Sequence, residues 1–296
     1  MNKAKDLHFQ ISAILPVLIL FSLFYFIPII VLVVTSFMEW DKLQIGGFAG
    51  FNNYIHLFTD PVDSRAFELA IKNNLSWTLF VIFIHIPLAL VTALILHSKN
   101  KGWKIFRVLF FIPNIISITA IAIIFRQLFN PSYGVMNWLF EIMNIESMTD
   151  VNLLFHKTYG WYSIIATWIL YIGFPTVVLL AELEAIPKEL YESAQIEGAT
   201  KGQEHVFITL PLLKNIIGTL CILLVTAGFR EFERIYLLTG GAPEYRTGTL
   251  SLLVYEKMTY VQFAYSNSVG VFLLIIGVLF ILIFNRLFKI GKSVYL

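Results

Sequence analysis

Long apolar segments alternate with short charged ones along this chain of 296 residues. Six of the apolar segments come close to the roughly 20 residues that a helix needs to cross a bilayer. We therefore expect membrane-spanning helices at residues 11–37, 75–97, 105–125, 161–183, 212–229 and 269–287. The pattern predicts an all-α polytopic membrane protein in which residues 1–296 form a single transmembrane domain.

The first apolar segment, 11–37, shares one feature with a secretory signal peptide, because Lys3 and Lys5 precede it. Its apolar core is longer than that of a signal peptide, and no small-x-small cleavage motif follows it. We therefore interpret this segment as a retained membrane anchor.

The segment between the fourth and fifth expected spans, 186–213, is polar. Pro187 suits the start of a helix, because its missing N–H group needs no partner there. Gly198 suits the left-handed residue that often ends a helix, and Pro211 interrupts a second helix at the edge of the next span. This pattern predicts a short, rigid helix–turn–helix on the membrane surface.

An amphipathic loop lying on lipid headgroups is the alternative interpretation of 186–213. Such a loop is expected to present Lys and Arg, because the cytoplasmic leaflet is anionic. Here four Glu residues outnumber two Lys residues. The acidic character favours a basic protein surface as the partner over lipid.

Composition narrows the class of protein further. The chain is 58% hydrophobic and only 14% charged, whereas soluble domains have about a quarter of their residues charged. The net charge of +2 and the lack of a basic run argue against nucleic acid as a partner. The single cysteine, Cys221, cannot form an intrachain disulfide. No phosphate-binding loop, HExxH, CxxC or GxSxG motif is present, so we expect no catalytic residue, no metal site and no ATPase site.

Charge also predicts the orientation in the membrane. The segment 97–107, between the second and third spans, carries four basic residues and no acidic one, and the chain ends are basic as well. Because Lys and Arg concentrate in cytoplasmic loops, we expect both termini and the 186–213 loop to lie in the cytoplasm.

A spaced motif in the polar loop carries a family resemblance. Glu192, Ser193 and Ala194 are followed after three residues by Gly198, and nine residues later begins the run Ile208, Thr209, Leu210, Pro211. This resembles the coupling-loop motif of ATP-binding-cassette importer permeases, Glu-Ala-Ala-x3-Gly-x9-Ile-x-Leu-Pro, with Ser193 in place of the first alanine. Segments 48–54 and 238–243 also resemble signatures of the carbohydrate-type members, and the resemblance extends from about residue 48 to 267.

The resemblance implies a type I importer permease fold and a place as the first permease subunit of a maltose-type heterodimer for carbohydrate import. It implies a second homologous permease, an ATPase dimer that holds ATP and Mg²⁺, and an extracytoplasmic solute-binding protein, with this chain lying among lipids of a bacterial cytoplasmic membrane. It also implies contact with the ATPase through ten residues: Leu190, Tyr191, Glu192, Ser193, Ala194, Glu197, Gly198, Ile208, Leu210 and Pro211.

Polar and aromatic residues at the spans suggest a substrate path, because such residues are costly in a bilayer unless they face a cavity. Trp168 and Tyr171 share one helical face, and aromatic faces stack well on the C–H surfaces of sugars. Packing is the alternative role for each aromatic, and topological anchoring is the alternative for Glu231. We expect the path to include Asn114, Trp168, Tyr171, Gly173, Phe174 and Glu231.

A self-contained secondary transporter or channel for a small polar solute is the alternative function. Such carriers usually have an ionisable residue deep in a span, and often an internal repeat. Neither feature is visible in the sequence, and a membrane enzyme would need a catalytic cluster that is also not visible.

Overall fold

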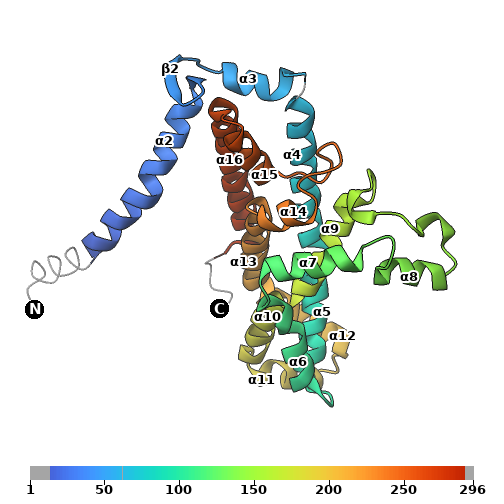
Figure 1. Cartoon of the computed structure of the whole chain (residues 1–296). Helices are drawn as coiled ribbons and strands as arrows, with labels where there is room; N and C mark the ends of the chain where they lie inside the picture. The colour runs from blue at the N-terminus through green and yellow to red at the C-terminus, as the bar shows by residue number, and fades with distance from the viewer. Residues whose placement is uncertain (1–13, 62, 291–296) are drawn as a thin grey trace, which may run out of the picture. The chain divides into compact units, whose positions relative to one another are not determined.

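The computed structural model describes residues 14–61 and 63–290, most of which are helical. The helices are α2 (Ile27–Ser36), α3 (Asn52–Thr59), α4 (Asp63–Phe80), α5 (Ile86–His97), α6 (Trp103–Phe111), α7 (Ile118–Leu128), α8 (Val135–Ile142), α9 (Gly160–Trp168), α10 (Gly173–Ala185), α11 (Lys188–Ile196), α12 (Lys201–Glu204), α13 (Leu210–Phe229), α14 (Glu233–Leu238), α15 (Leu250–Thr259) and α16 (Phe263–Phe288). Short π-helical segments are η1 (Ser22–Phe26), η2 (Val81–His85) and η7 (His205–Thr209), and 3₁₀ segments are η3 (Ile112–Asn114), η4 (Glu146–Met148), η5 (Leu153–Phe155) and η6 (Ile169–Ile172). Figure 1 shows their order along the chain.

Five helical runs are long and apolar enough to cross a membrane, which confirms the predicted helical and polytopic class. They are Ile14–Ser36, Asp63–His97, Gly160–Ala185, Lys201–Phe229 and Phe263–Phe288. The start of the expected span 11–37 and both chain ends lie outside the described residues.

A sixth span is present only as a bent pair. The sequence predicts one helix at 105–125, but helices Trp103–Asn114 and Ile118–Leu128 differ in direction by 96°. Pro113 lies in the short 3₁₀ turn η3 at the bend, where it cannot donate a backbone hydrogen bond. Ser117 then starts α7, because its side chain accepts a hydrogen bond from the Ala120 backbone N–H.

A small β-hairpin departs from the all-α expectation. Strands β1 (Met38–Asp41) and β2 (Gln44–Phe48) pair antiparallel, with Trp40 opposite Ile45. The two-residue turn between them contains Lys42 with a φ of 54°. The hairpin was missed because Met38–Asp41 alternates apolar and polar residues over only four positions, and the second strand, Gln44–Phe48, contains two glycines and does not alternate.

The helices form two compact units. One unit contains the described residues up to Arg65 together with Leu253–Leu274. Within it, Lys257 Nζ donates to Asp63 Oδ1 at 2.5 Å, and Asn267 Nδ2 donates to Thr35 Oγ1 at 3.0 Å. These bonds tie segments that are far apart in the sequence.

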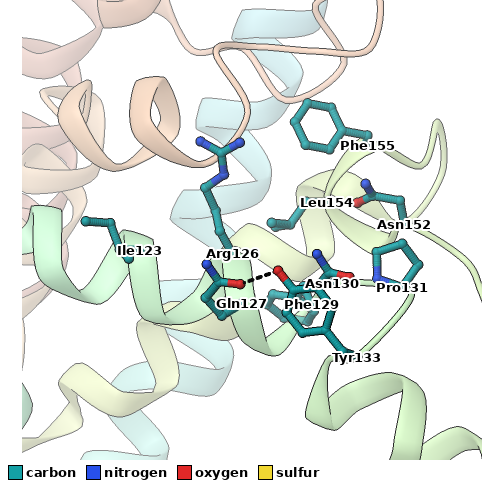
Figure 2. Close-up of a pocket in the computed structure, with 10 residues that line it drawn as sticks. All are labelled: Ile123, Arg126, Gln127, Phe129, Asn130, Pro131, Tyr133, Asn152, Leu154 and Phe155. Carbon is teal, nitrogen blue, oxygen red and sulfur yellow. Dashed lines mark hydrogen bonds between the residues drawn. The ribbon is translucent and has the colours of Figure 1, made fainter.

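The second unit contains Ala66–Leu252 and the described residues from Ile275 onward. In this unit α10 packs against α5, and α14 packs against α7. The polar loop that holds α11 and α12 follows the end of α10 (Figure 1). The far end of α7 borders a hollow lined by polar and aromatic side chains (Figure 2).

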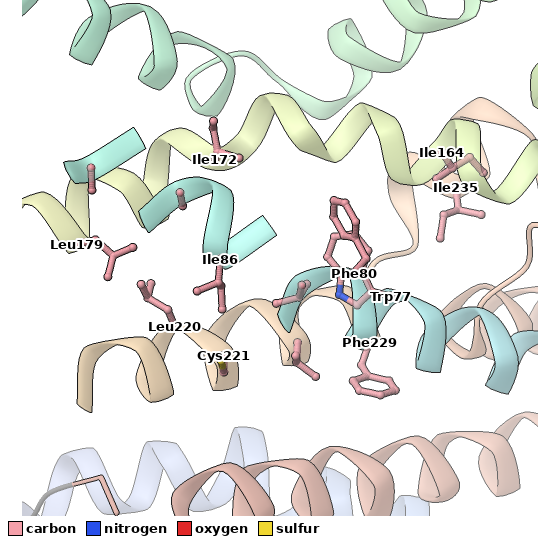
Figure 3. Close-up of a cluster of buried hydrophobic side chains, with 14 of the residues drawn as sticks. Trp77, Phe80, Ile86, Ile164, Ile172, Leu179, Leu220, Cys221, Phe229 and Ile235 are labelled. Carbon is pink, nitrogen blue, oxygen red and sulfur yellow. The ribbon is translucent and has the colours of Figure 1, made fainter. Parts of the chain in front are cut away.

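A buried apolar cluster holds the second unit together, and Trp77 lies near its centre (Figure 3). The indole Nε1 of Trp77 donates to the backbone oxygen of Leu224 at 3.3 Å, which joins α4 to α13. Gly228 permits this contact, because a Cβ atom at that position would lie 1.6 Å from Trp77 Nε1. In a bilayer, helices can approach this closely only where small residues leave space.

We expect Gly228→Ala to push the Trp77 ring out of its site and destabilise the protein by about 1–3 kcal/mol, the usual cost of overpacking. Thermal unfolding of the purified protein in detergent measures the loss. Gly277→Ala is the matched control, because a Cβ at Gly277 meets nothing within 4 Å. Equal stability of the two variants would show that Gly228 is not a close-packing position.

Candidate functional site

The polar loop forms two short helices that meet at a tight turn. The helix α11 ends in a Schellman motif, in which Gly198 N–H donates to Gln195 O at 3.0 Å and Ala199 N–H donates to Ala194 O at 2.9 Å. Gly198 has a φ of 83°, as expected for the left-handed residue of this motif. The sequence therefore located the end of α11 correctly.

The second helix, α12, begins with a capping box. The Thr200 side chain accepts a bond from the Gln203 backbone N–H, and the Gln203 side chain accepts one from the Thr200 backbone N–H. The π-helical segment η7 then connects α12 to α13. Both turns of the loop are thus fixed by local hydrogen bonds.

Buried polar contacts hold α11 against the rest of the loop. Glu204 is only 3% exposed, and its carboxylate accepts bonds from Gln195 Nε2 and Lys201 Nζ, each at 3.0 Å. The Tyr191 hydroxyl lies 3.0 Å from Thr209 Oγ1. These contacts make α11 part of a rigid surface rather than a flexible linker.

The opposite face of α11 is exposed and carries acidic and apolar side chains. Glu189, Glu192, Ser193 and Ile196 follow the i, i+3, i+4, i+7 spacing of one helical face, and all four are exposed. Ile196 is 87% exposed. We call these four residues the outer face of α11.

The acidic residues near the outer face are available to a partner. Within the part of the chain that the structure describes, no ion pair involves Glu189, Glu192 or Glu197. Charge-assisted hydrogen bonds to Arg or Lys would satisfy them.

The ten residues expected to contact the ATPase divide by exposure. Leu190, Glu192, Ser193, Glu197, Gly198, Leu210 and Pro211 are exposed, whereas Tyr191, Ala194 and Ile208 are half-buried. Sequence reasoning missed Ile196, although its position four residues after Glu192 places it on the same helical face.

A second polar cluster surrounds Arg234, which is 1% exposed. Its guanidinium carbon lies 4.0 Å from the centre of the Trp168 ring and 4.3 Å from that of the Tyr171 ring. Cation–π attraction of this kind is strongest where water is excluded. Trp168 and Tyr171 do share a face, as the sequence predicts, but Arg234 covers both rings in this conformation.

Glu231 belongs to the same cluster. Its Oε1 lies 3.8 Å from Arg234 Nε and accepts the Arg234 backbone N–H at 3.2 Å. Burial raises the pKa of the Glu231 carboxyl, and the positive charge of Arg234 opposes that shift. Glu233, two residues after Glu231, accepts a bond from Thr119 Oγ1 at 3.0 Å, which links α14 to α7.

Asn114 and Gly173 form a third contact. A Cβ at Gly173 would lie 2.0 Å from the Phe110 carbonyl oxygen and 2.8 Å from Asn114 Nδ2. Glycine therefore lets the start of α10 approach the end of α6. Phe174 follows with an exposed side chain.

Of the six expected path residues, the structure brings Trp168, Tyr171 and Glu231 together around Arg234. Arg234 was not predicted from the sequence, although its spacing of three residues from Glu231 is a signal for a local ion pair. The other half of the cluster comes from a distant segment, which spacing cannot reveal. Among the described residues, no group of three or more His, Cys, Asp or Glu side chains could hold a metal ion.

Comparison with known proteins identifies relatives over nearly the whole chain. Residues 85–291 match the family described as binding-protein-dependent transport system inner membrane component. The chain is 31% identical to the probable ABC transporter permease protein YurN of Bacillus subtilis over 93% of this chain and 94% of that protein. It is 32% identical to the multiple sugar-binding transport system permease protein MsmF of Streptococcus mutans, with 90% of each chain covered.

The fold is also similar to that of a solved transporter. Two crystal structures of a bacterial ABC transporter that imports the acidic polysaccharide alginate match with a TM-score of 0.82, 25% identity and 98% of each chain covered. One of them contains a periplasmic protein bound to an alginate pentasaccharide. This likeness confirms the expected importer-permease fold.

We expect Arg234→Met to destabilise the protein by about 3 kcal/mol, because it leaves the Glu231 carboxylate buried without its cation. Thermal unfolding in detergent measures the effect. The double variant Glu231→Gln/Arg234→Met should recover part of the loss, since no isolated charge remains. If the double variant is less stable than the single one, the ion pair is not the reason that Arg234 is buried.

Proposed function

This chain belongs to the binding-protein-dependent transport system inner membrane components, and we propose that it is the half-pore of a carbohydrate importer driven by a separate ATPase. As an ABC transporter permease it is a multi-pass protein of the cytoplasmic membrane and not itself the ATPase. The observation that carries the proposal is the outer face of α11, which is exposed, acidic and rigidly held.

Carbohydrate is the proposed substrate class. The S. mutans relative is the permease of a multiple sugar-binding system, and the structurally similar transporter imports alginate. The aromatic rings of Trp168 and Tyr171 could stack on a sugar. Arg234 lies over both rings, so it must release one of them before that ring can take part.

The coupling mechanism follows from the two faces of α11. On the outer face, Ile196 can enter an apolar pocket of the ATPase while Glu192 binds a basic side chain beside it. On the inner face, Tyr191 and Gln195 hold the helix to Thr209 and Glu204 in the rest of the loop. Movement of the ATPase would then carry α11 and α10 as a rigid body and change the pore. ATP and Mg²⁺ are held by the partner in this scheme.

The remaining partners are proposed from the family. A binding protein delivers the sugar on the outer side, and a second permease completes the pore. The loop from Leu238 to Pro243 supports a place as the first of the two permeases, and it contains Gly240 and Gly241 in left-handed conformations. We further propose that residues 1–296 work as one permease domain, with the loop at 186–213 and both termini in the cytoplasm.

We expect Glu192→Lys to abolish ATP-dependent uptake while the protein still inserts into the membrane, because the change reverses the docking charge. Uptake of radiolabelled sugar into vesicles that contain the assembled transporter measures the effect. Glu146→Lys, the same charge change at an exposed residue of the loop on the other side, should leave uptake unchanged. Normal uptake by the Glu192 variant would refute its coupling role.

We expect Ile196→Ala to weaken binding of the ATPase by about tenfold, the effect of removing a moderate interface anchor. Titration of the purified ATPase onto the permease in nanodiscs measures the affinity. Ile142→Ala removes another exposed isoleucine, on α8, and should have no effect. Equal affinities for the two variants would exclude Ile196 from the interface.

A further inference from the structure

The hollow at the end of α7 has a volume of about 400 Å³ and is not explained by the coupling mechanism. Its walls include Arg126, Gln127, Asn130, Tyr133, Asn152 and Phe155. Figure 2 shows these side chains around one space, with residues from α7 on one side and from the segment before α9 on the other. The volume falls within the range of small-molecule sites, about 300–1,000 Å³.

Topology places this hollow on the side from which solute arrives. It is built by the connection between the third and fourth spans, whereas the 186–213 loop connects the fourth and fifth. Consecutive connections separated by one span lie on opposite sides of the membrane. If the α11 loop docks a cytoplasmic ATPase, the hollow therefore faces outward.

The polar groups of the hollow are partly fixed and partly available. The Tyr133 hydroxyl donates to Gln127 Oε1 at 2.7 Å, and Asn130 Oδ1 accepts the Ser132 backbone N–H at 2.9 Å. By contrast, the Arg126 guanidinium and the Asn152 amide form no side-chain hydrogen bond or ion pair within the described part of the chain. Two planar polar groups thus remain for a ligand.

Charge and shape indicate which ligand. Arg126 is the sole charged residue among the ten that line the hollow. Its planar guanidinium can bind a carboxylate through two parallel hydrogen bonds. Tyr133 is 70% exposed, so its ring is free to stack on the C–H face of a sugar. Asn152 can donate to and accept from ring hydroxyls.

We propose that this hollow is an outer subsite for a carboxylated hexose, with the carboxylate on Arg126, the ring on Tyr133 and hydroxyls on Asn152. The proposal rests on the proposed function, which it refines by naming an acidic sugar. The helix α7 leads from the hollow toward Thr119, which is bonded to Glu233 on α14. Arg234 follows Glu233 directly in the chain, and its guanidinium lies over the rings of Trp168 and Tyr171.

An acidic side chain of a docked binding protein is the competing occupant. A stable protein interface buries roughly 800 Å² on each partner, mostly over flat or gently curved surface. The observations here are a half-open concave hollow, an exposed ring and two exposed planar groups without a side-chain partner, which together suit a small ligand better. The position of Arg126 in the last turn of α7 is also favourable for the helix dipole, but that does not account for Asn152 or Tyr133.

The test is saturation-transfer difference NMR on the assembled transporter in nanodiscs, with D-glucuronate and D-galacturonate as probes and D-glucose and D-galactose as their neutral counterparts. We expect at least one uronate to bind more tightly than its neutral counterpart. Arg126→Gln should weaken that binding by about tenfold or more, the effect of losing a charge-assisted hydrogen bond. Arg230→Gln removes an exposed arginine on the same side of the membrane and should change nothing.

Asn152→Ala provides a second variant, and it should weaken the uronate and the neutral sugar alike. Two binding results would overturn the proposal: no preference for either uronate over its neutral counterpart, or a preference that survives Arg126→Gln. A third contrary result would be that Arg126→Gln leaves sugar binding unchanged but abolishes the stimulation of transport by the binding protein. The last result would assign the hollow to protein docking. None of these outcomes bears on ATPase coupling, which the Glu192→Lys uptake experiment tests separately.

Discussion

The buried carboxylate of Glu204 makes the interaction on which the polar loop 186–213 depends. A carboxylate removed from water must be satisfied by charge and hydrogen bonds, and Glu204 receives both from Lys201 and Gln195. Because Gln195 belongs to α11 and Glu204 to α12, the same bonds fix the angle between the two helices. That angle decides which face of α11 is turned outward, and hence which residues a partner can reach.

From this loop, the helix α10 leads back toward α6 and the cluster around Arg234. The helix α10 runs from Gly173 to Ala185, a length of about 20 Å at 1.5 Å per residue. Its start packs closely on α6 because Gly173 has no side chain, and Tyr171 lies just before it against Arg234. A displacement of α11 could therefore reach the Arg234 cluster through one rigid element. In the structure Arg234 lies over both aromatic rings of that cluster.

Much of this architecture could be predicted from the sequence, because bilayer thickness and helix-end chemistry act locally. The apolar runs located the spans, and Pro187 with Gly198 located the ends of α11. Other features depend on partners that are distant in sequence. Spacing alone could not show that Tyr191 turns inward to Thr209 or that Arg234 lies between Trp168 and Tyr171. The bend near Pro113 was missed because the sequence stays hydrophobic through it. The break is visible only in the backbone, where the two helices differ in direction by 96°.

We infer that the outer face of α11 docks the ATPase while its inner face stays packed against the chain. Maleimide labelling of Ser193→Cys and Ala194→Cys tests it directly, because Cys221, the sole native cysteine, is buried. We expect Ser193→Cys to react quickly in the permease alone and to be protected when the ATPase is bound, whereas Ala194→Cys should react slowly in both states. Full reactivity of Ser193→Cys in the ATPase complex would show that the outer face of α11 does not contact the ATPase.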